Sequence, residues 1–272
     1  MSTPLEAYRR NRETLLTEIV NQLSNDPRFV AAWLTGSYGR DDADEMSDLD
    51  LRIIAAEPYS QTLCYRQEQV SHETTEERFA LFSRFGKPAL IHENNNNAPE
   101  GGTFTFVMYR DSAVMVDWIL VPLSKAKRPH ESRLLFDKAG IPIAPPPEPE
   151  ELERSKKYVA EQWAFFWMMM AVTIKYLIRK DYVFVTEWLE HLHGLVQDIE
   201  RRLHREPWKY TRGSLSQFQS TWEQQLDSLR SLCQNMQALA PQVEAFSGTS
   251  AALPLEEIER LMALAEEVHA RN

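Results

Sequence analysis

Two aspartates one residue apart stand at the start of a strand-like stretch of the sequence. Residues 34–54 read LTGSYGRDDADEMSDLDLRII, so Asp48 and Asp50 follow the pair Gly36 and Ser37 across a short acidic segment. Alternate residues of a strand face the same side of a sheet, so these two carboxylates would lie close together and repel each other. A hard divalent cation such as Mg²⁺, which prefers oxygen ligands, would offset that repulsion.

The Gly-Ser pair supplies the complementary half of such a site. A glycine lets the backbone approach an anion closely, and a serine at a strand-to-helix turn offers its hydroxyl and amide to phosphate oxygens. Acid-rich loops and isolated Asp-x-Asp pairs are common on solvated surfaces, so neither feature is informative alone. In the order strand, Gly-Ser, turn and Asp-x-Asp strand, they predict a site for a nucleotide and a metal ion.

The elements that must position this site are predicted from the spacing of apolar residues. Helices are expected over residues 5–23 and about 73–85. The expected strands cover residues 29–34, 49–55, 88–92, 103–109 and 113–121. The short turn at 110–112 predicts an antiparallel hairpin, and strands without regular intervening helices favour a mixed sheet.

The proline-rich segment 141–149 marks a boundary, because proline continues neither a helix nor a sheet ladder. Beyond it, helices are expected over about 150–179, 183–204, 215–239 and 255–271. The predicted fold class is therefore α+β: a small mixed sheet with flanking helices in residues 1–144, followed by an all-α helical bundle in residues 145–272.

Composition restricts the class of protein. The chain is 43% hydrophobic and 26% charged, as in soluble globular proteins. Cys64 and Cys233 lie far apart and in no metal-binding spacing, which fits a reducing compartment. The longest apolar stretch, residues 163–178, contains Lys175 and is shorter than the roughly 18 to 20 residues of a membrane span. A cytoplasmic protein without a signal peptide or a membrane partner is expected.

The net charge of −10 is a poor electrostatic match for nucleic acid, so no nucleic-acid partner is expected. An acidic surface would suit a cationic ligand, although ordinary solubility is the simpler explanation. The negative net charge also disfavours polymerase and tRNA-tailing activities, which need a basic surface for nucleic acid. We expect a monomer or a homodimer.

The segment GSYGRDDADEMSDLDL, residues 36–51, resembles the signature of the DNA polymerase β-type nucleotidyltransferase superfamily, in which Asp-x-Asp follows Gly-Ser after roughly ten residues. The length of the chain, its single helical C-terminal part and the segments RLLFDKAG and WAFFWMMMAVTIKYLIRKD are similar to antibiotic nucleotidyltransferases that act on aminoglycosides and lincosamides. The resemblance implies transfer of a nucleoside monophosphate, AMP from ATP or the equivalent from another nucleoside triphosphate, to a hydroxyl of a small molecule. It also implies Mg²⁺, with two ions expected.

By this resemblance, Gly36 and Ser37 match the positions that hold the β- and γ-phosphates, and Asp48 and Asp50 match metal ligands. The superfamily places a third carboxylate on a later, adjacent strand. Asp117 in AVMVDWILV is the best candidate, because a charge inside an apolar strand is rarely tolerated without a partner. It would complete the metal site or act as the base toward the acceptor hydroxyl. A buried acid paired with an arginine is the alternative.

Four further residues are weaker candidates. Arg40 could reach a phosphate or pair with one of the acids at 41, 42 and 44. Lys175, which interrupts an apolar helix, could meet the triphosphate or simply extend its ammonium group to water. Glu187, beside Trp188, and Glu93 are candidate acids for a cationic substrate. The aromatic and methionine stripe at 163–170 is expected to be core, although part of it could line a ligand site.

Two alternative functions remain open. One is a nucleotidyltransferase that modifies a protein partner, as in toxin–antitoxin pairs, but such proteins tend to be shorter and to lack a helical bundle. The other is a nucleotide-binding module without turnover, which the presence of all three acids disfavours.

Overall fold

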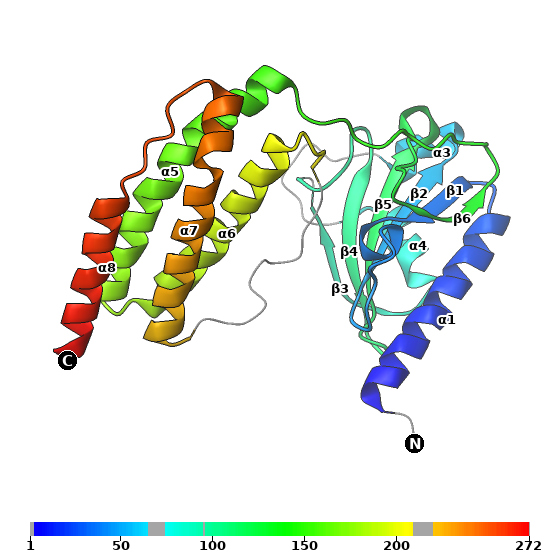
Figure 1. Cartoon of the computed structure of the whole chain (residues 1–272). Coiled ribbons are helices and arrows are strands. Elements are labelled where there is room, and N and C mark those ends of the chain that lie inside the picture. The colour runs from blue at the N-terminus through cyan, green and yellow to red at the C-terminus, as the bar shows by residue number, and fades with distance from the viewer. Residues whose placement is uncertain (1–2, 65–73, 95, 209–219, 272) are drawn as a thin grey trace. The chain divides into compact units, whose positions relative to one another are not determined.

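The computed structural model describes residues 3–64, 74–94, 96–208 and 220–271 (Figure 1). The chain divides into two compact units, Met1–Pro146 and Pro147–Asn272. All strands of the described residues belong to the first unit, and the second unit is helical. The predicted combination of a mixed sheet with a following helical region is confirmed.

The first unit is built on a six-stranded sheet with the order β3-β4-β5-β2-β1-β6. The strands are β1 (Phe29–Leu34), β2 (Leu49–Ala55), β3 (Pro88–Glu93), β4 (Thr103–Tyr109), β5 (Met115–Pro122) and β6 (Arg133–Asp137). Only the central pair β2 and β5 is parallel; the other neighbours are antiparallel, including the expected β4–β5 hairpin. Edge strand β6 was not anticipated, because its five residues do not alternate clearly between buried and exposed positions.

The main core of this unit lies between the sheet and its helices. These helices are α1 (Pro4–Asn25), α3 (Glu57–Leu63) and α4 (Glu76–Ser83); the expected start of α4 at residue 73 lies outside the described residues. Ile19 of α1 and Phe82 of α4 join Leu49 and Leu51 of β2 in one buried cluster. Because strand side chains alternate, the intervening Asp50 faces the opposite side of the sheet, away from this core.

The second unit consists, in its described residues, of α5 (Leu152–Ile178), α6 (Tyr182–Leu203), α7 (Trp222–Ser247) and α8 (Leu255–Ala270). Helix α5 packs against each of the other three. Helix α7 was expected to end at residue 239, but it continues through Pro241 and ends at Ser247, eight residues later. It stops before Gly248, which lies in the left-handed region. Burial of Val243 in the bundle offsets the cost of the internal proline. The expected helix start at residue 215 lies outside the described residues.

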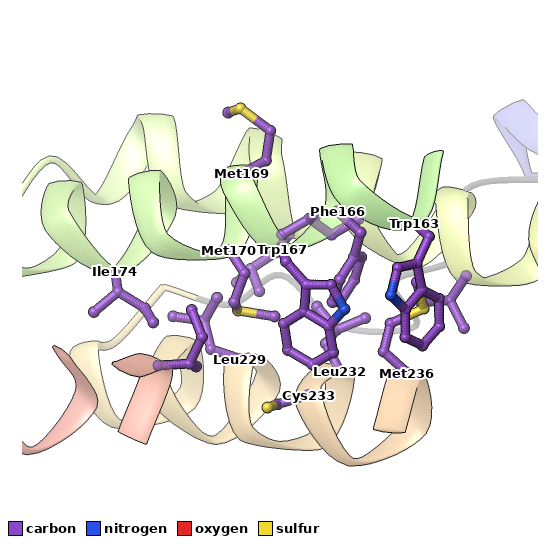
Figure 2. Packing of buried hydrophobic residues seen from close by; sticks show 14 of the residues in the cluster. Trp163, Phe166, Trp167, Met169, Met170, Ile174, Leu229, Leu232, Cys233 and Met236 are labelled. Atoms are coloured by element: carbon purple, nitrogen blue, oxygen red, sulfur yellow. The ribbon is translucent and has the colours of Figure 1, made fainter. Parts of the chain in front are cut away.

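The aromatic stripe of α5 is mostly core, as expected. Figure 2 shows Trp167 and Met170 pointing toward α7, where they lie with Leu232 in one buried cluster. Phe165 and Met168 are instead exposed on the other side of α5. Among the described residues, no helix combines the length and the apolarity needed to cross a bilayer.

A buried ion pair fastens α4 to the edge of the sheet. Arg78 is 0% exposed and Glu93 of β3 is 5% exposed, and Arg78 Nη2 lies 2.7 Å from Glu93 Oε1. Arg78 Nε also donates to Glu93 Oε2 at 3.1 Å, and Arg78 Nη1 donates to the carbonyl oxygen of Leu63 at 3.3 Å. Such a two-pronged arginine–carboxylate contact is both strong and geometrically specific.

Replacing Glu93 by glutamine should lower the free energy of unfolding by about 3–5 kcal/mol, because the charge of Arg78 would stay buried without its partner. Urea unfolding followed by circular dichroism measures the change. Glu100→Gln is the matched control, since it removes an exposed pair with Lys125 and should leave the midpoint close to that of the wild type. Equal midpoints for the two variants would contradict a structural role for the buried pair.

Candidate functional site

Asp50 and Asp117 lie side by side on the two central strands of the sheet. β2 and β5 run parallel with Asp50 directly paired to Asp117, so both side chains project from the same face. Neighbouring strands lie about 4.8 Å apart, which keeps the two carboxylates close to each other. Both residues are partly exposed, whereas Leu49, Leu51, Val116 and Trp118 beside them are buried on the opposite face. Asp48 is also partly exposed and immediately precedes β2.

The electrostatics of the three acids are coupled. Burial and the negative charge of Asp48 raise the pKa of Asp50 to about 6, against the opposing effect of Arg40. Burial and the charges of Asp50 and Asp48 raise the pKa of Asp117 to about 7. The alternative that Asp117 is a core acid neutralised by an arginine therefore finds no support, because the charges that shift its pKa are carboxylates. A cation would stabilise the ionised forms.

The Gly-Ser pair packs directly against the first of these acids. Gly36 begins the short helix α2 (Gly36–Gly39) with a φ of +57°, in the region that favours glycine. A Cβ atom on Gly36 would lie 1.8 Å from Asp50 Oδ2, so no other residue fits without displacing the carboxylate. The amide of Thr35 also donates to the carbonyl oxygen of Asp50 at 2.9 Å, which ties the turn to β2.

Ser37 and Arg40 occupy the same short helix and its end. Ser37 is 8% exposed, and its Oγ has no hydrogen-bond partner among the described residues. A buried hydroxyl without a partner costs about 1–3 kcal/mol, which an oxygen atom of a ligand would recover. Arg40 Nε lies 3.3 Å from Asp42 Oδ2, yet its charge also reaches Asp50. Arg40 thus forms an ion pair within the acidic segment and also lowers the pKa of Asp50.

The donor chemistry at these acids fits a hard divalent ion. All the candidate ligands are carboxylate oxygens, and their mutual repulsion requires a positive charge. Within the described part of the chain, however, no three His, Cys, Asp or Glu side chains form a ready-made metal cluster. Mg²⁺ usually takes only one or two protein carboxylates and completes its shell with water and substrate phosphates. The arrangement therefore fits an ion that is shared with a phosphate ligand rather than enclosed by protein.

The remaining sequence-based candidates lie elsewhere. Lys175 of α5 and Glu187 of α6 belong to the second unit, and both side chains are exposed. The Nζ atom of Lys175 lies 5.2 Å from the ring centroid of Tyr176. The assignment of Glu93 as a substrate-binding acid was wrong, because its carboxylate is buried and engaged by Arg78. A lone acid at a strand end does not reveal such a partner, which lies 15 residues away on a helix.

Two arginines near the acids were not anticipated. Arg52 follows Asp50 by two residues on the same face of β2, and its buried Nε has no hydrogen-bond partner among the described residues. Arg12 of α1 is buried and contacts the segment that precedes Asp48. Its position on the buried side of α1, in series with Leu15 and Ile19, was a signal available in the sequence.

Comparison with known families identifies the family of the chain. A family model described as streptomycin adenylyltransferase matches residues 9–200, which include the whole sheet, α5 and most of α6. A search of curated proteins found no match. Because the family model covers well over half of the 272 residues, the chain belongs to the streptomycin adenylyltransferase family and is an adenylyltransferase.

Proposed function

We propose that this adenylyltransferase transfers AMP from ATP to a hydroxyl group of a small, cationic antibiotic of the aminoglycoside or lincosamide type, with Mg²⁺ as the metal ion. The observation that carries the proposal is the paired register of Asp50 and Asp117 beside the Gly36 turn, in a chain of this family. The name of the family refers to streptomycin, an aminoglycoside, which supports an acceptor of that class.

The acids and the Gly-Ser turn have separate roles in this proposal. Asp48, Asp50 and Asp117 would hold Mg²⁺, for which two ions are expected. Bound Mg²⁺ supplies the positive charge that neutralises the phosphates and lowers the pKa of the attacking hydroxyl. Gly36 lets the turn approach the triphosphate, and the unpartnered hydroxyl of Ser37 donates to a phosphate oxygen. Arg40 adds a positive charge at the edge of the site.

The reaction forms one bond and breaks one. The hydroxyl oxygen of the acceptor attacks the α-phosphorus of ATP, and the bond from that phosphorus to the oxygen bridging to the β-phosphate breaks. Pyrophosphate leaves with the electron pair of the broken bond, and the hydroxyl proton passes to one of the carboxylates of Asp48, Asp50 and Asp117. The residues of the chain contribute mainly by orienting the reactants and stabilising charge.

Two residues of the helical unit remain proposed ligand contacts. Lys175 is proposed as a contact for an anionic ligand group and Glu187 as a contact for a cationic one, in keeping with their charges and their exposed side chains. The free cysteines Cys64 and Cys233 support action in a reducing cytoplasm. We propose a monomer or a homodimer without a nucleic-acid partner, in keeping with the net charge of −10.

Release of pyrophosphate tests the proposed reaction. The protein is incubated with Mg²⁺, each nucleoside triphosphate in turn and a panel of aminoglycosides and lincosamides. We expect release with ATP that depends on one acceptor and stops when the metal is removed with EDTA. Asp48→Asn should reduce the rate by about 10²-fold or more, because charge at the phosphates loses its stabilisation. Asp41→Asn, in the exposed part of the acidic segment, is the matched control and should retain the wild-type rate.

Three outcomes would contradict the proposal. Full activity of Asp48→Asn would exclude the metal assignment. Product formed only on a co-purified protein would favour a protein acceptor over an antibiotic. Binding of ATP without pyrophosphate release under any of these conditions would favour a nucleotide-binding module.

The close approach of Gly36 to Asp50 gives a second test. Gly36→Ala should reduce pyrophosphate release by about 10²-fold or more, because the new methyl group occupies the position of the Asp50 carboxylate. Gly140→Ala is the matched control, since Gly140 has a similar φ of +69° but no atom within 4 Å of an added Cβ. Both variants place alanine at a similar positive φ, so equal loss of activity would contradict the assignment of the effect to the contact with Asp50.

A further inference from the structure

Arg12 forms hydrogen bonds to the backbone of the turn that precedes Asp48. Its Nη1 atom donates to the backbone carbonyl oxygens of Asp44 at 3.3 Å, Glu45 at 3.1 Å and Ser47 at 2.5 Å. The last of these carbonyls belongs to the residue immediately before Asp48. α1, which packs on the opposite face of the sheet, therefore holds the backbone immediately before Asp48.

The turn that Arg12 holds is also closed by its own side chains. The amide of Asp44 donates to Ser47 Oγ at 2.8 Å, and Ser47 Oγ donates to Asp44 Oδ1 at 3.1 Å. These bonds fold residues 44–47 so that three carbonyl oxygens converge on one guanidinium group. All three contacts are made by the one nitrogen Nη1, at the far end of the arginine side chain.

The burial of Arg12 has no explanation in an ion pair. Arg12 is 4% exposed, and no carboxylate forms a salt bridge with it among the described residues. Its Cζ atom instead lies 5.5 Å from the ring centroid of Tyr38 and 5.9 Å from that of Tyr8. A buried charge is costly unless it is hydrogen-bonded, so the three carbonyl contacts of Nη1 offset part of this cost, while Nε has no hydrogen-bond partner among the described residues.

Tyr38 extends this connection to the phosphate side of the site. It lies in α2 between Ser37 and Gly39, and the amide of Asp42 donates to the carbonyl oxygen of Ser37 at 3.0 Å. Arg12 therefore contacts both segments that flank Asp50: the turn before Asp48 through its carbonyls, and α2 through the ring of Tyr38.

We infer that Arg12 is a positioning residue of the adenylyltransferase site, which fixes the backbone before Asp48 and aligns it with the Gly36–Gly39 turn. This inference rests on the proposed function, because the role of the aligned residues is to bind Mg²⁺ and ATP. Arg12 itself touches neither substrate and acts through the turn that it holds.

Hydrogen–deuterium exchange of the metal-free protein provides a test that does not depend on activity. Arg12→Lys keeps the positive charge, but its side chain is one bond shorter, so its ammonium group falls short of the position of Nη1. We expect amides of residues 41–50 to exchange at least tenfold faster than in the wild type, while those of β4 are unchanged. Mn²⁺ binding in the presence of ATP, measured by electron paramagnetic resonance, should weaken by at least tenfold. Arg9→Lys, at an exposed position of the same helix, is the control for both measurements.

A second variant keeps the test decisive if Arg12→Lys does not fold. Ser47→Ala opens the same turn without changing α1, and it should accelerate exchange in the same amides and weaken Mn²⁺ binding. Wild-type exchange at 41–50, or faster exchange there with unchanged Mn²⁺ affinity, would overturn the inference. Failure of the wild type to bind Mn²⁺ and ATP is a separate result: it would overturn the proposed function, and the inference with it.

Discussion

Repulsion between the carboxylates of Asp50 and Asp117 is the constraint on which the account of the site depends. The two residues are paired across adjacent parallel strands, and their shared burial and charge raise both pKa values. A protein does not gain stability from such a pair. A cation bound between the two carboxylates and the phosphates of a ligand would offset this repulsion. An adenylyltransferase provides that environment during its reaction.

The sheet and its helices hold this unfavourable pair in place. β2 and β5 are central strands with neighbours on both sides, so neither acid can relieve the repulsion by moving its backbone. On one side Gly36 brings the turn of α2 against Asp50, and on the other Arg12 fixes the turn before Asp48. The core beneath the sheet, with α1 and α4, supplies the rigidity for these contacts.

Local patterns in the sequence were sufficient for much of this fold. The strands at 29–34 and 49–55 were predicted at their observed bounds, because short apolar runs between turn residues leave few alternatives. β6 has no such pattern, and α7 continues through a proline because its far end is buried in the bundle. These differences arise from tertiary contacts that local spacing does not contain.

The same distinction holds for the candidate site. The family signature marked Gly36, Ser37, Asp48 and Asp50, and the family match agrees with that signature. The resemblance to the superfamily suggested Asp117 as a third acid on an adjacent strand, but its direct pairing with Asp50, 67 positions away, depends on strand order and register and cannot be read from spacing. The wrong assignment of Glu93 and the omission of Arg12 have the same origin, since each depends on one buried contact between distant segments.

The most direct measurement of the central claim is the melting temperature of the wild type and of Asp117→Asn at pH 8, first in EDTA and then with Mg²⁺ and a non-hydrolysable ATP analogue. At this pH, above the folded-state pKa of about 7, Asp117 is ionised at a cost in the folded protein. The account predicts that the variant melts at a higher temperature than the wild type in EDTA, and that the added Mg²⁺ and analogue stabilise the wild type far more than the variant. A variant that is less stable in EDTA, or that gains as much stability as the wild type from Mg²⁺ and the analogue, would contradict it.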